Sequence, residues 1–467
     1  MPRLRPPYDP GFRPVIFSWR DYLDRARAAG AALLRVAVER ENGLVSAFVT
    51  RVPEKDADPA ATYLIVERLV KFLLWSRGGW RIHFLGPAVI GKRLKADYSE
   101  KGARAFDVRT MSRVYERPFE LVLHSPATFP EAREAVHFPG GHLDGCRIGF
   151  DLGASDYKVV AVVDGEPVYS EEIPWTPGEQ ADPDYHYRHI QEGLKKAAAH
   201  LPRVDAIGGS SAGVIIRNQV RIASLFRSVP EGVFDTKVKD IFVRLATEWG
   251  VPFEVINDGE VTALAGMLSL GETGIIGVAM GSSEAAGFLD ADGHIPGWLD
   301  ELAFVPVDLN PEAAVDEWSG DRGVGANYFS QQAVNKLAPA AGIAFPDAMT
   351  LPERLKQVQS LMGRGDERAA AIFETIGITL GFTIPWYEVF YKFGNLLVLG
   401  RVMSGPGGKI IVDKAAEVLK AEFPETAARV RIHLLDEKSR RVGQAVAAAS
   451  LPEIVKSAAG AAPGVLS

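Results

Sequence analysis

In the first 140 residues the spacing of apolar positions predicts strands and one clear helix. Asp58, followed by proline, is a helix-start signal, because Asp caps the first backbone N–H groups and Pro fits the first helical position. Apolar positions then recur at helical spacing, at Ile65, Leu69, Phe72 and Leu73. A Gly-Gly pair ends this helix, and three apolar runs predict strands: residues 33–38, 45–49 and 80–85. Residues 1–140 are therefore expected to form an α/β accessory region, bounded by the Pro/Gly-rich stretch 137–142.

A different pattern begins at Cys146, where apolar and polar positions alternate. Ile148, Phe150 and Leu152 alternate as in a strand, and residues 158–163 and 167–173 predict two more strands. The first connection is the small-residue turn Gly153-Ala154-Ser155-Asp156, and the second, Asp164-Gly165, is a hairpin signal. This segment is therefore expected to open a new α/β unit with a hairpin.

The same pattern returns 128 positions later, in residues 275–295. Strand, small-residue turn, strand and Asp-Gly turn recur in the same order. The matching positions are Gly149 with Gly277, Gly153 with Gly281, Ser155 with Ser283, Asp156 with Glu284, and Asp164-Gly165 with Asp292-Gly293. So long a period does not fit a solenoid and predicts two similar α/β halves, each opening with a hairpin. Coincidence among glycines is the alternative.

The rest of the chain alternates helices with strands, which indicates an α/β architecture. Helices are expected at residues 185–200, 237–249, 259–270, 409–422 and 440–449, and strands at 204–208, 253–256, 395–399 and 431–435. A long helical stretch, residues 327–391, is expected to break near Pro339, Pro346, Pro352 and Pro385.

The composition is that of an ordinary globular protein of 467 residues, 47% hydrophobic and 24% charged. A net charge of −7 argues against a protein that coats nucleic acid through phosphate contacts. The single cysteine, Cys146, excludes an intrachain disulfide and a cysteine-cluster zinc site. No signal-peptide core and no run of about 18 uncharged apolar residues is present, so we expect no membrane span and a cytoplasmic location.

Three loops of small residues follow predicted strands, and they are candidate phosphate-binding loops. Small residues let backbone N–H groups approach phosphate oxygens, and a following helix adds favourable dipole charge. The residues concerned are Gly153 and Ser155 in the first loop, Gly281 and Ser282 in the second, and Gly400, Ser404 and Gly405 in the third. The sequence has neither a P-loop motif nor a dinucleotide-binding glycine motif, which disfavours both of those classes.

Asp151 ends an apolar strand, where a carboxylate is costly unless it is paired or solvated. We interpret it as a Mg²⁺ partner beside a phosphate; the alternative is a cap for the turn that follows.

Asp258 stands between the predicted strand 253–256 and a helix. One reading is a general base, because a carboxylate there can accept the proton of a hydroxyl that attacks a γ-phosphoryl group. The other reading is the N-cap of the helix, a position that Asp favours.

Together these residues resemble the ROK family (repressors, open reading frames and kinases), within the superfamily of actin, hexokinase and heat-shock chaperone ATPases. Residues 148–158 look like its first phosphate loop, Asp-x-Gly-[Gly/Ala]-[Thr/Ser]. Asn257-Asp258 followed by residues 263–266 resembles its Asn-Asp-x-x-x-x-Ala-Leu-x-[Gly/Glu] segment, and Gly281-Ser282-Ser283 stands in place of its Gly-Thr-Gly loop. Residues 377–381 and 397–404 look like its connecting helix and adenosine loop.

The resemblance implies an α/β fold of duplicated actin-like ATPase (ribonuclease H-like) domains, with halves at 146–270 and 271–467 behind the accessory region. It implies an ATP-dependent kinase for a sugar or sugar derivative, with ATP and Mg²⁺ in a cleft between domains. The phosphates would be held by Gly153, Ser155, Gly281 and Ser282, the adenosine by Gly400, Ser404 and Gly405, and the metal by Asp151. Asp258 would be the base, and Asn257 and Glu301 would bind the sugar. Dimers are common in that family, so a homodimer is compatible with the resemblance.

The sequence departs from the family in three ways. Phe304 replaces the histidine of the Glu-x-Gly-His motif, and no cysteine cluster follows, so we expect no zinc. Glu284 directly follows the second phosphate loop, where a carboxylate would repel a γ-phosphate unless a cation intervened. Residues 1–140 do not resemble the helix-turn-helix of ROK repressors.

These departures leave two other functions open. One is a catalytically degenerate ROK-like protein that binds sugar or nucleotide in a regulatory or structural role. The other is a protein-binding ATPase of the actin or chaperone type, for which the chain offers no added peptide-binding domain.

Overall fold

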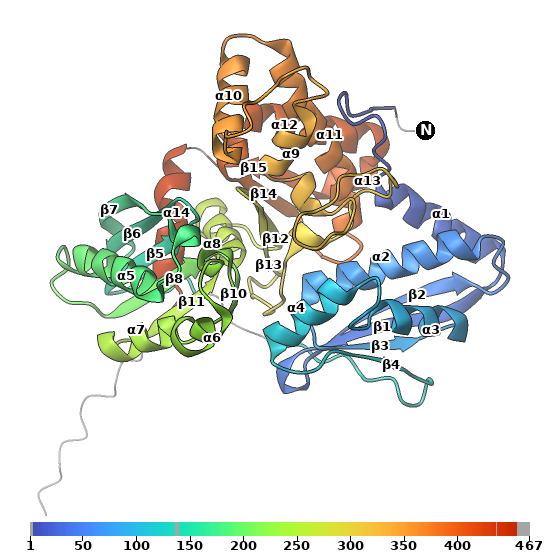
Figure 1. Ribbon diagram of the computed structural model, residues 1–467, viewed down its shortest axis with the longest axis horizontal. Coiled ribbons are helices and arrows are strands. Elements are labelled where there is room, and N and C mark those ends of the chain that lie inside the picture. Colours follow the sequence, from blue (N-terminus) through green and yellow to red (C-terminus); the bar gives the residue numbers. More distant parts are fainter. Residues whose placement is uncertain (1–2, 136–139, 436, 455–467) are drawn as a thin grey trace, which may run out of the picture. The chain divides into compact units, whose positions relative to one another are not determined.

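The computed structural model describes residues 3–135, 140–435 and 437–454 and divides into two compact units (Figure 1). Unit 1 comprises the described residues of Met1–Pro139 and Asn257–Arg441, and unit 2 those of Gly140–Ile256 and Val442–Ser467. Residues 137–139 of the expected boundary stretch lie outside the described residues. The three-part division expected from the sequence stays a prediction.

Unit 2 is built on a five-stranded sheet in the order β11-β8-β5-β6-β7. Strands β5 (Cys146–Leu152), β6 (Asp156–Val163) and β7 (Glu166–Pro174) pair antiparallel, as the hairpin pattern predicted. β8 (Ala206–Ser211) pairs parallel with β5, and β11 (Phe253–Asn257) completes the sheet.

Helices cover both faces of this sheet. Side chains of α5 (Pro183–Ala198) and α7 (Ile241–Trp249) share a core with Ile148, Phe150 and Leu152 of β5. On the other face α14 (Glu437–Ala449) packs its Ala445 and Ala449 on Val160 and Val162 of β6. Three further short elements complete the unit: β9 (Val214–Ile216), β10 (Gln219–Ile222) and α6 (Glu231–Val233).

Unit 1 contains a second sheet with the order β13-β12-β14-β15. β12 (Ile275–Met280) pairs antiparallel with β13 (Glu284–Leu289) and parallel with β14 (Asn395–Leu399), which pairs parallel with β15 (Arg431–Leu434). The β12–β13 hairpin repeats the β5–β6 hairpin: the first strand ends at Leu152 and Met280, and the second begins at Asp156 and Glu284. The sequence repeat is therefore a structural one, as predicted, and the chain has the duplicated actin-like α/β fold.

Helices of unit 1 pack on this sheet and on one another. They are α8 (Asp258–Leu270), α9 (Gln331–Leu337), α10 (Leu351–Gly363), α11 (Glu367–Tyr387), α12 (Pro406–Glu422) and α13 (Pro424–Arg429). A helix end is predicted near Pro385, and α11 ends at Tyr387, two residues beyond that proline, which lies in its last turn. By length and composition, α11 could cross a membrane, and it is the one such helix among the described residues; 83% of its most apolar window is buried. It packs along α12, so it is a core helix.

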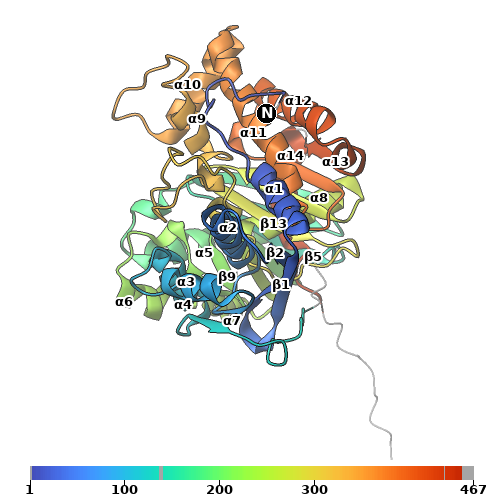
Figure 2. The ribbon, with the colours of Figure 1, turned by 90° about the vertical axis from the view of Figure 1, so that its right-hand side faces the viewer.

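The N-terminal part of unit 1 is an α/β layer with the strand order β2-β1-β3-β4 (Figure 1, with a second view of the layer in Figure 2). Its strands are β1 (Ala31–Glu39), β2 (Val45–Pro53), β3 (Arg81–Leu85) and β4 (Glu120–Leu123), and its helices are α1 (Val15–Ala28), α2 (Pro59–Arg77), α3 (Ala88–Asp97) and α4 (Ala105–Tyr115). Asp58 caps α2 as predicted, accepting the N–H of Ala61 at 3.0 Å, and Gly78 ends it with φ +77°. The pattern did not reveal α1, α3 and α4.

An aromatic cluster joins α1 and α2 to the end of α11. The ring of Phe72 in α2 stacks on Phe390 at 3.9 Å and meets Trp386 edge-on at 5.4 Å. Trp19 of α1 lies 5.9 Å from Trp386. Burying such rings stabilises the interface strongly, so the N-terminal layer is part of the core of unit 1.

A buried ion network joins α2 to Asp321, which lies in the long connection between β13 and α9. Lys71 contacts Asp107 at 2.9 Å and Asp321 at 3.2 Å, and Lys71 and Asp107 are each about 1% exposed. Arg68 and Arg104 also contact Asp321, at 2.9 and 2.8 Å, and both pair with Glu67. Three cations thus meet three carboxylates, which lowers the cost of keeping these charges away from water.

Candidate functional site

Unit 2 holds Asp151 at the end of β5. The residue is 8% exposed, and one carboxylate oxygen accepts a hydrogen bond from the Ser210 hydroxyl at 2.5 Å. Lys158 Nζ lies 3.7 Å from the other oxygen. Ser210 is the partner of Asp151 in the parallel β5–β8 register, so the two strand ends bring these side chains together.

Hydrogen bonds fix the shape of the first predicted phosphate loop, which contains Gly153 and Ser155. Gly153 N–H donates to the Asp156 carbonyl at 3.0 Å, and the Trp175 indole donates to the Gly153 carbonyl at 2.7 Å. A Cβ on Gly153 would lie 2.8 Å from the Asp156 carbonyl oxygen, which is too close for a larger residue without a shift. Ser155 is exposed, and its hydroxyl donates to Asp156 at 3.0 Å.

The donor set at Asp151 suits a magnesium-bound phosphate. Its polar groups are carboxylate and hydroxyl oxygens, the hard ligands that Mg²⁺ prefers. The nearby ammonium of Lys158 fits the charge of a phosphate.

Unit 1 holds Asp258 as the first residue of α8. The N-cap role is taken by Asn257, whose side-chain oxygen accepts the Gly259 N–H at 2.7 Å in a capping box with Glu260. The reading of Asp258 as the N-cap is therefore wrong. Gly259 sets the start of this helix against β13, since a Cβ there would lie 1.9 Å from the Ala286 carbonyl oxygen.

Glu301 lies close enough to Asp258 for the two carboxyl groups to interact. Burial, together with the charges of Asp258 and Asp300, raises the pKa of Glu301 to about 8. The structure thus brings together two residues that the sequence assigned separately, to base and substrate roles. Neighbouring carboxyl groups, one of them with a raised pKa, are a common arrangement at proton-transfer sites.

Glu284 is buried in unit 1, so the prediction that it is a repelling charge beside the second phosphate loop is wrong. The residue is 2% exposed and accepts a hydrogen bond from the Tyr387 hydroxyl at 3.2 Å. Burial raises the pKa of Glu284 to about 8, with the neighbouring Glu301 adding to the shift. It is therefore a mostly protonated core residue at neutral pH.

The second and third predicted loops lie side by side in unit 1. A Cβ on Gly400, which has φ +101°, would lie 2.6 Å from the carbonyl oxygen of Met280, the residue before Gly281. Gly281 N–H donates to the Ser283 carbonyl at 3.0 Å, two residues on, whereas Gly153 N–H donates three residues on; Ser282 is exposed.

The third loop leads into α12 and is supported from α10. Gly405 is the N-cap of the 17-residue α12, and Ser404 precedes it. The Gln359 side chain of α10 donates to the Arg401 carbonyl at 2.9 Å and reaches the Ser404 carbonyl at 3.5 Å. Space for a ligand is open at Gly405, where a Cβ would meet nothing within 4 Å, and the helix N-terminus favours negative charge.

Phe304, which replaces the family histidine, faces the N-terminal layer. Its ring lies 4.3 Å from Trp75 of α2 and 5.7 Å from Phe106 of α4. The position is therefore filled by an apolar contact.

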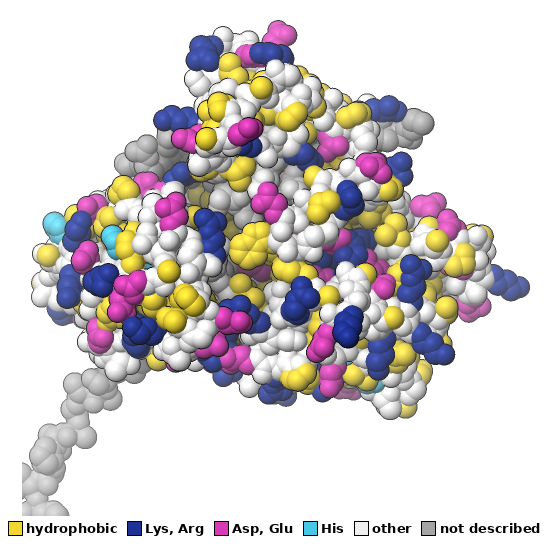
Figure 3. Space-filling view, viewed as in Figure 1, with side chains coloured by type: hydrophobic (Ala, Val, Ile, Leu, Met, Phe, Trp, Pro, Cys, Tyr) yellow, Lys and Arg dark blue, Asp and Glu magenta, His cyan; other side chains and the backbone are white. Residues whose placement is uncertain are grey.

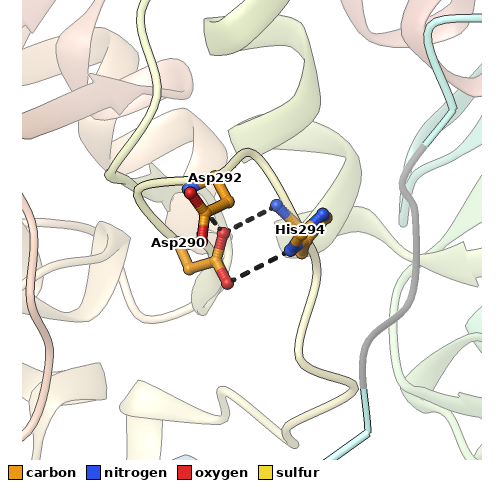
Figure 4. A group of neighbouring side chains, drawn as sticks. All are labelled: Asp290, Asp292 and His294. Atoms are coloured by element: carbon orange, nitrogen blue, oxygen red, sulfur yellow. Dashed lines mark hydrogen bonds and ion pairs between the residues drawn. The ribbon is translucent and has the colours of Figure 1, made fainter.

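One group of potential metal ligands lies in the Asp-Gly turn after β13 (Figure 4). Asp290 accepts the N–H groups of Asp292 and His294 at 2.9 and 2.8 Å, and His294 Nδ1 lies 3.6 Å from its other oxygen. These bonds account for the arrangement as an ordinary turn.

On the face drawn in Figure 3, the Lys and Arg side chains of the described residues are interspersed with Asp and Glu.

Sequence reasoning missed the supporting residues Ser210, Gln359 and Tyr387. Ser210 alone had a readable signal, because it comes two residues after the predicted strand 204–208; in the structure it pairs with Asp151 in the parallel β5–β8 register. Gln359 and Tyr387 reach the site from distant helices, which local patterns do not reveal.

No protein-family model matches the sequence, and no curated protein matches it. Many solved structures match the fold, and they include a glucokinase and a transcriptional regulator. A ROK family glucokinase from Streptomyces griseus, solved with glucose and AMPPNP, has a TM-score of 0.50 and 17% identity, over 65% of this chain and 99% of that chain. A ROK family transcriptional regulator, a homologue of the E. coli MLC protein, has a TM-score of 0.50 and 17% identity, over 66% of this chain and 78% of that chain.

At this level of identity the likeness concerns the fold, and it is shared by a kinase and a regulator. The resemblance expected from the sequence motifs is thereby confirmed: this chain is similar in fold to ROK family proteins, with the duplicated actin-like ATPase architecture.

Proposed function

We propose that the protein transfers the γ-phosphoryl group of ATP to a hydroxyl group of a sugar or sugar derivative. The observation that carries the proposal is the pair of carboxyl groups at the start of α8, where burial, with the charge of Asp258 adding to it, raises the pKa of Glu301 to about 8. One carboxyl group that accepts a proton beside another that retains one can both activate and bind a hydroxyl-rich substrate.

In this proposal Asp258 accepts the proton of the attacking hydroxyl as the new oxygen–phosphorus bond forms and the bond to ADP breaks. Glu301, protonated near neutral pH, can donate one hydrogen bond to the sugar and accept others. Asn257, fixed as the helix cap, adds a polar contact at the same place.

Gly153, Ser155, Gly281 and Ser282 are assigned to the phosphates of ATP, Gly400, Ser404 and Gly405 to its adenosine, and Asp151 to Mg²⁺. The support is the small-residue turn of each hairpin, where a glycine N–H donates to a nearby carbonyl, and the oxygen donors at Asp151. Mg²⁺, when bound, supplies positive charge that offsets the charge of the transferring phosphoryl group.

The test is the release of ADP from ATP and Mg²⁺ with a panel of monosaccharides that includes amino and N-acetyl sugars. Asp258→Asn should lower kcat by about 10²–10⁴-fold, the usual contribution of a general base, with nucleotide binding retained in a thermal-shift assay. Asp292→Asn, a carboxylate of the same unit outside the proposed site, is the matched control and should keep wild-type turnover. An active Asp258→Asn variant would show that the base is another group.

The second candidate is a ROK-like protein that binds a sugar or nucleotide without phosphoryl transfer. Phe304 favours it, because the ring packs on Trp75 where the kinases of the family carry a histidine. Calorimetry that detects sugar or nucleotide binding, together with no turnover across the panel, would support this candidate over the kinase.

A further inference from the structure

The segment that carries Glu301 is held by the last turn of α2. The backbone N–H groups of Leu299, Asp300 and Glu301 donate to the carbonyls of Arg77, Ser76 and Trp75, at 3.3, 2.9 and 3.1 Å respectively. The last carbonyls of a helix have no N–H partner within the helix, so they need donors from elsewhere, such as these three N–H groups. Three consecutive residues of a predicted substrate segment are thus paired with the N-terminal layer.

The side chain of Arg77 extends the same contact. Its guanidinium lies 3.4 Å from the centroid of the Trp298 ring and 4.5 Å from that of Tyr391, and it donates to the Phe390 carbonyl. The Tyr391 hydroxyl in turn donates to Asp300 at 2.7 Å. Asp300 has φ +49°, a strained value for a residue other than glycine, so these contacts hold a bend that the chain would not choose unaided.

The segment after β13 needs this support because the β5–β6 and β12–β13 hairpins differ at their outer edges. In unit 2 a third strand, β7, pairs with the outer edge of β6. Among the described residues of unit 1 no strand pairs with the outer edge of β13. The residues after β13 reach this edge through Asp300, whose carboxylate accepts the Phe288 N–H, and α2 secures them from the other side.

We propose that the C-terminal turn of α2, with Arg77 as its main side chain, is a positioning element that fixes Glu301 for sugar binding. The N-terminal layer would then set the affinity for the sugar without touching it. This inference rests on the proposed function, because it assigns a supporting role for the substrate carboxyl group named there.

Arg77→Lys tests the proposal, because Lys keeps the charge but lacks the planar group that stacks on Trp298. We expect the KM for the sugar to rise by about tenfold or more, with the KM for ATP changed less than about twofold, since tenfold reflects a modest loss of positioning. Amide exchange of residues 299–304 should be faster in the variant. Trp298→Leu removes the other partner of the stack at a half-buried position and should act in the same direction.

Arg68→Lys is the matched control, because Arg68 is a buried arginine of the same helix that contacts Glu67 and Asp321 instead. It should lower thermal stability and leave the sugar KM unchanged. The proposal is overturned if Arg77→Lys and Trp298→Leu speed exchange at 299–304 and keep the wild-type sugar KM, or if Arg68→Lys raises that KM equally. A wild-type protein that neither binds nor phosphorylates any sugar would instead refute the proposed function, and this inference with it.

Discussion

Three carboxyl groups of unit 1 lie where the fold removes them from water. Burial raises the pKa of Asp300 to about 6 and those of Glu284 and Glu301 to about 8. Tyrosine hydroxyls offset part of the cost, from Tyr391 to Asp300 and from Tyr387 to Glu284. Near neutral pH Asp300 is therefore mostly ionised, whereas Glu284 and Glu301 mostly retain their protons.

Glu284→Gln should flatten the pH dependence of stability. Folded Glu284 holds its proton up to pH about 8, whereas an unfolded Glu loses it near its ordinary value of 4.5. The folded state therefore binds more protons between these values, and the free energy of unfolding falls as pH rises through this interval, by up to about 1.4 kcal/mol per pH unit from this group. Urea unfolding at pH 5, 6, 7 and 8 measures the slope. The exposed Glu166→Gln is the control, and equal slopes for wild type and Glu284→Gln would contradict the prediction.

At the scale of elements, the two halves use the same device to seat a helix on the first strand of the hairpin. Gly149 of β5 lies against α14, where a Cβ would come 1.8 Å from the Ala445 carbonyl oxygen. Gly277 of β12 lies against α8, where a Cβ would come 2.7 Å from Thr262 Cγ2 and 2.9 Å from Ala263 N. These glycines are one of the pairs in the sequence repeat, so the repeat records a packing requirement.

Gly149→Ala and Gly277→Ala should both destabilise the protein, because the added methyl group forces a helix away from its strand. Overpacking of this kind typically costs about 1–3 kcal/mol. The effect should be greater at Gly149, where the methyl group meets rigid backbone. Chemical denaturation measures it, with Gly363→Ala as the control, since a Cβ there meets nothing within 4 Å. Equal stability of Gly149→Ala and wild type would show that α14 has room to shift.

The elements that sequence patterns predicted well are those whose signals are local. The β5–β6 and β12–β13 hairpins, β14 and the cap of α2 at Asp58 follow from alternation, turn residues and caps. Helix α1 was missed although Ile16, Trp19, Tyr22 and Ala26 recur at helical spacing on one buried face, which is a local signal of the same kind.

The candidate site was less predictable, because its geometry depends on contacts between distant parts of the chain. Asn257 and Asp258 compete for the cap in sequence, and only the start of α8 decides between them. The orientation of the Glu284 side chain into the core depends on its hydrogen bond with Tyr387, about a hundred residues later in the chain. The contact of α2 with Glu301 has no sequence signal, because it is made by backbone groups.

At the scale of the whole molecule, about a third of the chain lies outside the matches to ROK structures. The N-terminal layer is nevertheless built into unit 1 through α11, where Phe72 and Trp19 cover Trp386. Unit 1 therefore differs from a domain with a separate appendage joined by a linker.

Deletion of residues 1–135 should prevent unit 1 from folding in soluble form. The deletion would expose the rings of Trp386 and Phe390 and leave Asp321 without the three cations that contact it. The soluble fraction on expression and the thermal unfolding curve measure the effect. A soluble truncated protein with a wild-type melting temperature would show that the layer contributes nothing to the core.

The ion network between α2, α4 and Asp321 limits how this protein can be engineered and how its sequence can change in evolution. Its six charged groups balance one another, so replacing a single member leaves an opposite charge stranded in the interior. A chimera that takes the N-terminal layer from one homologue and the rest from another needs matched partners at position 321. Substitutions at these six positions should accordingly be inherited as a set rather than one at a time.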